Sequence, residues 1–200
     1  MTTAVVCMAY GGPRSLDEVE PYYTDIRGGR KPSPEALADL MSRYEKIGGL
    51  SPLPEITKRQ ADALGAALQA ASPGEYRTYV GMKHWHPFVA EAIEQVVADG
   101  AERVIGLALA PHYSKMSIGG YEDRLKAAQA KTGGTFTLDM IHSWYENPSF
   151  VAFSATNLRT ALGGWDPADP ATRVFFSAHS LPERILAQGD PYRDQLLASS

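Results

Sequence analysis

The sequence predicts an α/β fold in which parallel strands alternate with helices, and three observations support this prediction. Short uninterrupted apolar runs, such as AVVCMA (residues 4–9) and VIGLALA (104–110), are typical of strands that helices cover on both faces. Longer segments with helix-start and helix-stop residues separate these runs. Each run also ends in a polar or glycine-rich loop, which is where an open α/β sheet places its ligands.

Composition limits the classes of protein to consider. The chain has 200 residues, 44% apolar composition and a net charge of -4, so it can bury a core and offers no basic surface for nucleic acid. Cys7 is the only cysteine, which excludes an internal disulfide and fits a reducing, cytoplasmic location. No basic leader precedes the first apolar run, and no run approaches the roughly 20 residues of a membrane span. We therefore expect no stable membrane insertion.

The first predicted strand, residues 4–9, ends at Tyr10, which is expected at the carboxyl end of the sheet. Ser15 followed by Glu18 matches a capping box, so a helix is predicted to run from there up to the next glycines. The following segment, residues 26–34, is glycine-rich and basic and predicts a mobile cationic loop.

A second helix is predicted to begin with Ser33 as N-cap and Pro34 as first residue and to end at Gly48. Arg43 flanks its apolar stripe. Arg43 either reaches an anionic ligand or lays its aliphatic stem on the apolar surface. The stripe recurs at three- and four-residue steps and is expected to face inward; it comprises Leu37, Leu40, Met41, Tyr44 and Ile47.

The prolines of GGLSPLP, residues 48–54, hold Ser51 in a non-helical loop, and a helix over residues 55–71 follows. Strand-like alternation over residues 76–82 then leads to Lys83 and His84 at another polar strand end. The inward face of the helix over 55–71 is predicted to comprise Ile56, Leu64, Ala67, Leu68 and Ala71.

Pro87 is predicted to open the next helix, which runs through Val97. His84 and His86 would point to opposite faces of an extended chain, which disfavours a metal site made by this pair. Further elements complete the alternation: strands over 104–110, 136–141 and 174–176, helices beginning near Tyr121, after Pro148 and near Pro191, and a loop over 163–170.

His179 occupies the most informative position in the second half of the chain. The run Val174 to Phe176 predicts a short buried strand that presents His179 at its carboxyl end. Imidazole titrates near neutral pH and is a common metal ligand, so His179 could accept a proton, bind a metal, or do both in turn. The alternative is that His179 only hydrogen-bonds a neighbouring loop.

The order of elements predicts two Rossmann-like lobes with parallel sheets flanked by helices. The first lobe spans residues 1–112 and carries the cationic and proline-rich loops. Residues 113–200 form the first part of a second lobe, which carries His179. The strands at 136–141 and 174–176 are expected to belong to this second sheet. Two strands are fewer than a parallel sheet usually has, so we expect this second sheet to be incomplete.

Four segments of the chain resemble the ferrochelatase family: MAYGGP (8–13), RYEKIGGLSPLPEIT (43–57), LAPHYSKMSIGGY (109–121) and SAHSLPERILAQGDPY (177–192). They span the whole chain, and the GGxSPL and HSLPE blocks are specific in combination. Tyr10 together with YYTDIRGGRKP (22–32) is most similar to the monomeric coproporphyrin III ferrochelatases of Gram-positive bacteria.

The resemblance implies a chelatase-like fold and a lyase that forms nitrogen–metal bonds. Such an enzyme inserts ferrous iron into coproporphyrin III during haem biosynthesis, so iron is a substrate and no tightly bound cofactor is expected. It also implies a cytoplasmic monomer whose partners are coproporphyrin III and ferrous iron. Two alternatives remain: a chelatase for another tetrapyrrole, such as sirohydrochlorin with cobalt or nickel, and a porphyrin or haem carrier without turnover.

Matching motifs also imply roles for individual residues. His179 would handle the metal and the proton, and Tyr10 would be a metal ligand at the opposite face of the macrocycle. Lys83 and His84 would form a polar pair at the cleft edge. The porphyrin and its propionates would be held by Arg27, Arg43, Tyr44, Ser51 and Tyr121. For Tyr44 and Tyr121, packing of the ring in the core is the alternative.

Two departures from the family pattern affect these expectations. Gly28 stands where the family often carries a second arginine, so the resemblance does not imply that arginine's propionate contact for this chain. Family members also continue beyond the position of Ser200 with a glutamate that faces the histidine across the metal site. We therefore expect the 200-residue chain by itself to be an incomplete enzyme.

Overall fold

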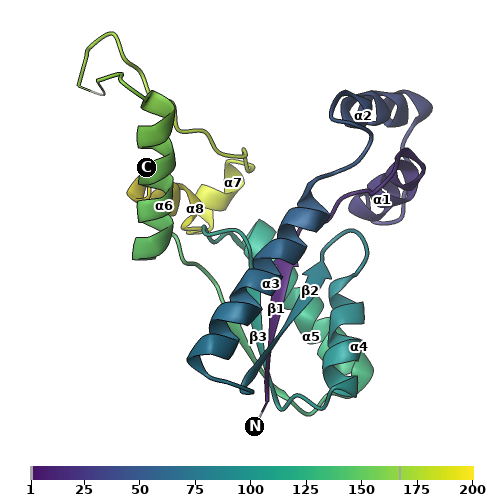
Figure 1. The fold of residues 1–200 in the computed structure, drawn as a ribbon. Helices are drawn as coiled ribbons and strands as arrows, with labels where there is room; N and C mark the ends of the chain where they lie inside the picture. Colours follow the sequence, from purple (N-terminus) through teal and green to yellow (C-terminus); the bar gives the residue numbers. More distant parts are fainter. Residues whose placement is uncertain (1, 167) are drawn as a thin grey trace. The chain divides into compact units, whose positions relative to one another are not determined.

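A four-stranded parallel sheet is the main feature of the structure, a computed structural model that describes residues 2–166 and 168–200 (Figure 1). Adjacent strands follow the order β2-β1-β3-β4, and all three pairings are parallel. The strands are β1 (Thr3–Ala9), β2 (Tyr76–Met82), β3 (Arg103–Ala108) and β4 (Thr137–Ile141). This confirms the predicted α/β fold with a parallel sheet flanked by helices.

The helices between successive strands supply the crossovers that parallel pairing requires. One helix packs on β1 and β2, while two others pack on each other and on the sheet. Their bounds are η1 (Leu16–Glu18), α1 (Val19–Ile26), α2 (Pro34–Lys46) and α3 (Leu53–Ala71) between β1 and β2, α4 (Val89–Ala98) between β2 and β3, and α5 (Gly120–Thr132) between β3 and β4.

The core forms on both faces of β1, whose seven residues are all buried. Val5 and Cys7 pack with Ala61 of α3 on one face. Since successive side chains of a strand point to opposite faces, Val6 and Met8 face the other side. There Val6 lies beside Gly81 of β2, next to α4. Alternation therefore lets one strand bury side chains against helices on both faces.

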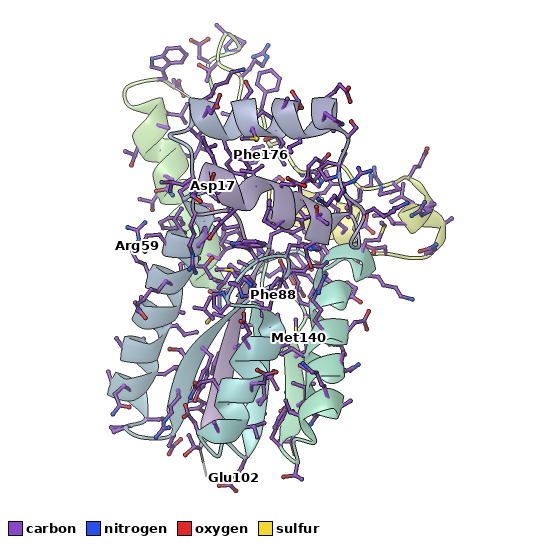
Figure 2. The ribbon with its side chains drawn as sticks, turned by 90° about the vertical axis from the view of Figure 1, so that its right-hand side faces the viewer. Asp17, Arg59, Phe88, Glu102, Met140 and Phe176 are labelled. Carbon is purple, nitrogen blue, oxygen red and sulfur yellow. The ribbon has the colours of Figure 1, made fainter. Side chains whose placement is uncertain are left out.

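The strand order places a topological switch point next to β1. The chain steps from β1 to β2 on one side and later returns to β3 on the other side. In open α/β sheets, ligands bind outside the carboxyl ends of the strands at such a point. Figure 2 labels Phe88, which lies beyond the carboxyl end of β2, and Glu102, which precedes the amino end of β3.

The chain divides into two compact units, one made of residues up to Leu109 with Gly120–Ile141, the other of Ala110–Gly119 with His142–Ser200. Within the described residues, the second unit contains a π-helical turn and three helices. Asp190 stabilises it, because one carboxylate oxygen accepts from the Ser114 hydroxyl and from the Lys115 N–H, both at 2.9 Å. Its elements are η2 (Lys115–Gly119), α6 (Pro148–Leu162), α7 (Arg184–Ala187) and α8 (Tyr192–Ala198).

Two strand predictions are wrong in the second half of the chain. β4 pairs with β3, so residues 136–141 complete the first sheet instead of beginning a second one. Residues 174–176 form no strand, and the side chains of Phe175 and Phe176 are 89% and 64% exposed. A strand needs a neighbour for its backbone hydrogen bonds, and the second unit has no strand within the described residues. The division into lobes at 112/113 stays a prediction.

The helix-start predictions have different outcomes. Ser33 caps α2 as predicted, since its hydroxyl accepts from the Ala36 N–H at 3.3 Å. Ser15 makes no side-chain cap, so the capping box is wrong. The Glu18 carboxylate accepts instead from the Arg14 N–H at 2.7 Å. No helix in the described part of the chain is long and apolar enough to cross a membrane.

The apolar faces of the helices are less buried than their periodicity predicts. α2 has no fully buried residue among its described positions, and Ile47 is exposed, because this helix packs on α1 and η1 and not on the sheet. On α3 the predicted inward Ile56 is exposed, and Thr57 and Ala61 are buried in its place. The predicted 163–170 loop includes residue 167, which lies outside the described residues. Helix α7 was missed by the sequence prediction.

Candidate functional site

Polar and aromatic side chains follow the neighbouring strands β1 and β2 where each strand ends. Tyr10 follows β1, and Lys83 and His84 follow β2. The Lys83 N–H donates to the Ala9 carbonyl at 2.9 Å, and the His84 N–H donates to the Tyr10 carbonyl at 3.0 Å. Because these bonds continue the β1–β2 pairing beyond the strands, the backbone fixes Tyr10 beside His84.

His84 is buried under this edge, with 8% of its surface exposed. Its ring centroid lies 4.5 Å from that of Tyr10, and its Nδ1 lies 2.8 Å from Oδ2 of Asp25 on α1. Burial lowers the pKa of His84, and the Asp25 carboxylate opposes this shift without reversing it. At neutral pH the ring is therefore neutral, and its Nδ1–H donates to Asp25.

Tyr10 is the accessible member of this pair of tilted rings, with 43% of its surface exposed. Partial burial raises the pKa of its phenol, Asp25 and Tyr44 act in the same direction, and Arg124 opposes them. The hydroxyl consequently keeps its proton at neutral pH. It can hydrogen-bond a ligand or contact it through the ring face.

Lys83 extends the site toward α5. Its ammonium group lies 5.2 Å from the ring centroid of Tyr121, within the range of a cation–π contact. A Cβ on Gly120 would lie 2.6 Å from the Lys83 Nζ, so the absence of a side chain there leaves room for the ammonium. Burial and the charge of Arg124 lower the pKa of Lys83. Tyr121 is 7% exposed, and burial raises its pKa.

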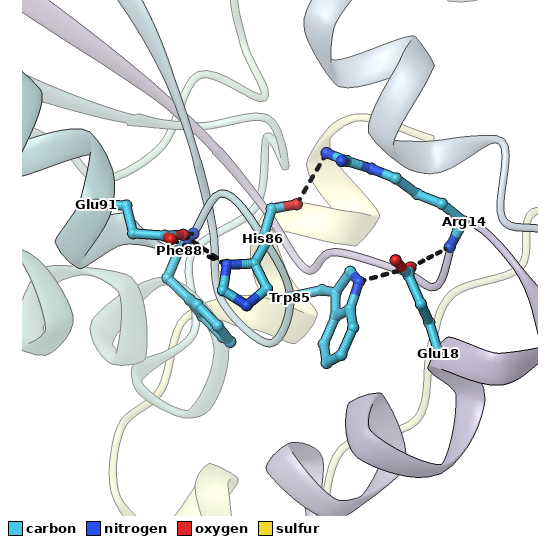
Figure 3. Close-up of polar contacts among 6 residues, drawn as sticks. All are labelled: Arg14, Glu18, Trp85, His86, Phe88 and Glu91. Carbon is cyan, nitrogen blue, oxygen red and sulfur yellow. Dashed lines mark hydrogen bonds and ion pairs between the residues drawn. The ribbon is translucent and has the colours of Figure 1, made fainter.

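The carboxylates of Glu18 and Glu91 hold the loops that follow β1 and β2 (Figure 3). Glu18 accepts from the Trp85 Nε1–H at 2.7 Å, which ties η1 to the loop after β2. Glu91 of α4 accepts from the Phe88 N–H at 2.5 Å and lies 2.9 Å from Nδ1 of His86. His86 therefore has a partner different from that of His84. That these two histidines form no shared metal site stays a prediction.

Ser51 closes the loop after β1 from the other side. Its N–H donates to the Pro13 carbonyl at 2.8 Å, and its hydroxyl accepts from the Leu53 N–H at 3.2 Å. A Cβ on Gly12 would lie 2.5 Å from the Ser51 Oγ, so this contact requires glycine. Ser51 also lines a pocket of about 550 Å³ together with loop residues, among them Arg14, and with residues of α3 and β2.

The remaining predicted binding residues of this unit lie on or next to α1 and α2. The Arg27 guanidinium lies 5.6 Å from the Tyr23 ring centroid, and Arg43 forms an exposed ion pair with Asp39 at 2.6 Å. Tyr44 is half-buried, and burial raises its pKa. The structure thus groups Tyr10, Lys83, His84 and Tyr121, whereas the contacts of Arg27 and Arg43 are with other partners. Their binding of a porphyrin stays a prediction.

His179 belongs to the second unit. It is exposed in a segment without helix or strand, and its carbonyl accepts from the Tyr192 hydroxyl at 3.3 Å. Within the described residues, no group of three or more His, Cys, Asp or Glu side chains could hold a metal ion. The roles of His179 and Tyr10 toward a metal therefore stay predictions.

Two residues of the site were missed by the sequence prediction. Arg124 follows Tyr121 by three residues, so helical periodicity places both on one face of α5, and this spacing could have revealed it. Asp25 reaches His84 across 59 positions of sequence. No local pattern indicates that contact.

A doubly wound parallel sheet with aromatic and cationic side chains beyond its strand ends defines a ligand-binding α/β protein of the Rossmann type. The family model for ferrochelatase matches residues 2–200. The chain is 50% identical over 200 residues to "Ferrochelatase" of Herpetosiphon aurantiacus, covering 99% of this chain and 65% of that protein. This chain belongs to the ferrochelatase family.

Two further relatives carry a more specific name. The chain is 46% identical to "Coproporphyrin III ferrochelatase 2" of Bacillus cereus, covering 96% of this chain and 60% of the relative. It is 44% identical to "Coproporphyrin III ferrochelatase" of Oceanobacillus iheyensis, covering 96% of this chain and 62% of that relative. The chain thus spans less than two thirds of the length of these three relatives.

Proposed function

We propose that this chain carries the porphyrin-binding edge of an enzyme that inserts ferrous iron into coproporphyrin III and forms Fe-coproporphyrin III in haem b biosynthesis. The observation that carries the proposal is the exposed Tyr10, whose ring lies in tilted contact with a buried, neutral His84 at the switch point of the sheet. A flat apolar macrocycle is recognised by aromatic surface, and Tyr10 offers such a surface at the position where this fold binds ligands.

Metal insertion requires a base, because two pyrrole N–H protons leave as Fe²⁺ enters the ring. The raised pKa of Tyr10 keeps its phenol protonated at neutral pH, so Tyr10 is a poor proton acceptor. The proposed acceptor is His179, whose imidazole is accessible to solvent and would pass the first proton to water before it accepts the second. Tyr10 would then serve as a ligand to iron from its own face of the macrocycle, and iron is a substrate of the reaction.

His179→Ala tests this assignment of the base. We expect the variant to lose metal insertion while it keeps porphyrin affinity, because the proposed binding contacts lie elsewhere. The rate of zinc or iron insertion and the dissociation constant from porphyrin fluorescence are measured on the same preparation of the full-length protein. Turnover close to that of the wild type would show that His179 is not the proton acceptor.

Coproporphyrin carries four carboxylates and protoporphyrin carries two, so removal of a cationic partner should affect coproporphyrin more. We expect Arg43→Ala to raise KM for coproporphyrin about tenfold, with a smaller effect for protoporphyrin. Arg59→Ala on α3 is the matched control, because Arg59 is also exposed and near an acidic residue four positions away. Equal rises for both porphyrins would mean that Arg43 supports the fold.

One assay separates the proposed activity from its alternatives. Metal insertion by the full-length protein is measured with coproporphyrin, protoporphyrin and sirohydrochlorin, and binding of each is measured in parallel. The proposal predicts the highest kcat/KM for coproporphyrin. Preference for sirohydrochlorin would indicate another chelatase, and tight porphyrin binding without turnover would indicate a carrier.

A further inference from the structure

Lys83 and Arg124 are two neighbouring cations without an anionic partner in the described part of the chain. Neither charged group forms an ion pair or a side-chain hydrogen bond there. Other cations of α5 differ in this respect, since Lys126 pairs with Glu122 at 2.6 Å and Lys131 pairs with Glu94 at 3.5 Å. Among the cationic side chains of α5 together with Lys83 beside it, Lys83 and Arg124 are therefore the two that lack such a partner within the described residues.

The geometry of α5 brings the two charges to one side of the helix. The Lys83 Nζ lies next to Gly120, the first residue of α5, and over the ring of Tyr121. Arg124 follows Gly120 by four residues and Tyr121 by three, which is the spacing of neighbours on a helix face. Arg124 also lowers the pKa of Lys83, as expected for like charges at short range.

The nearby acidic groups do not neutralise this pair. Asp25 hydrogen-bonds His84, and it forms no ion pair with Arg124 among the described contacts. Asp123 acts on Lys83 only through its charge, without an ion pair. Two like charges that are partly removed from water are unfavourable unless an anion joins them.

We propose that Lys83 and Arg124 together bind one carboxylate of the tetrapyrrole substrate, at a subsite on the carboxyl side of the sheet between Tyr10 and the first turns of α5. This inference rests on the proposed function and adds Arg124 to the binding residues. The planar guanidinium can hold a carboxylate through two parallel N–H donors, and the ammonium supplies a point charge beside it. The ring of Tyr121 fixes the ammonium from below.

The test is a fluorescence titration of the purified protein with coproporphyrin III. Arg124→Gln and Lys83→Gln remove the charge with little change in length, and Lys126→Gln removes a charge from the same helix outside the subsite. We expect each subsite variant to raise Kd about tenfold, which corresponds to one charge-assisted contact. The double variant should raise Kd by less than the product of the single effects, because both cations hold the same carboxylate.

Arg124→Lys supplies a second variant, which keeps the charge and should bind within about threefold of the wild type. An unchanged Kd in Arg124→Gln, or an equal loss in Lys126→Gln, would overturn the subsite while the wild-type binding still supports the proposed function. Multiplicative single effects in the double variant would also contradict a shared carboxylate. If the wild type bound no porphyrin, the proposed function would fail and the subsite with it.

Discussion

His84 can be buried beneath an exposed tyrosine because Asp25 gives its ring a hydrogen-bond partner. A buried imidazole without such a partner would lose its hydrogen bonds to water at a cost of about 1–3 kcal/mol. The contact joins α1 to the loop after β2. The surface under Tyr10 therefore depends on a residue far away in the sequence.

Asp25→Asn tests this dependence at the level of one residue. The hydrogen bond and the charge of Asp25 both raise the pKa of His84, so the neutral amide should lower that pKa below its wild-type value. An NMR titration of the His84 ring protons measures the change. Glu91→Gln, which alters the partner of His86, is the control and should leave the titration of His84 unchanged. An unchanged His84 pKa in Asp25→Asn would contradict the contact.

Cys7 predicts a loss of stability in alkaline solution. Burial raises the pKa of its thiol from 9.0 to about 11. Between these values the unfolded thiol ionises while the native thiol stays protonated, so the free energy of unfolding falls as pH rises, by up to about 1.4 kcal/mol per pH unit. The stabilisation that comes from keeping the Cys7 thiol protonated is fully present below pH 9.0.

Urea unfolding from about pH 8 to about pH 11 measures this slope. Buried tyrosines contribute with the same sign, so the comparison is between the wild type and Cys7→Ala. The alanine variant should be less stable near pH 8 because it leaves a small cavity, but its stability should fall less steeply as pH rises. Identical slopes would mean that the thiol of Cys7 titrates normally.

At the scale of elements, Gly81 shows why α4 can lie close to β2. A Cβ on Gly81 would be 3.1 Å from the Cα of Val89 and 3.2 Å from a methyl of Val6. The first of these neighbours is backbone, so it cannot move without shifting the start of α4. We expect Gly81→Ala to lower the free energy of unfolding by about 1–3 kcal/mol.

Gly164→Ala provides the matched control, because a Cβ there has no neighbour within 4 Å among the described residues. Its stability should stay within about 0.5 kcal/mol of the wild type. Both variants are compared by urea denaturation. If Gly81→Ala were as stable as the control, the contact between α4 and β2 would be looser than the structure indicates.

Local sequence patterns predict most of the helices and strands, but they do not predict which elements pack or pair with one another. Uninterrupted apolar runs locate β1 and β3, and Ser33 with Pro34 locates the start of α2. A run of similar composition at residues 174–176 forms no strand. Strand formation depends on a neighbouring strand, and periodicity within one segment carries no information about that neighbour.

At the scale of the whole molecule, the sequence likewise predicts some parts of the candidate site and leaves others unpredicted. The sheet edge was predictable, since Tyr10, Lys83 and His84 each follow an apolar run directly. The contacts made by Asp25 and Glu18 were not, because they depend on how α1 and η1 pack against the loop after β2. A net charge of -4 likewise gives no indication of the two cations beside Tyr121.

Hydrogen–deuterium exchange with and without coproporphyrin III tests most directly whether coproporphyrin III binds at the carboxyl edge of the sheet, as we propose. We predict slower exchange at the amides of residues 10–12, 83–85 and 120–121, which lie at or near that edge. Amides at the amino edge, at residues 101–102 and 133–136, serve as the internal control and should exchange at the same rate in both samples. Protection of the amino edge alone, or no protection at the carboxyl edge at saturating porphyrin, would contradict the account.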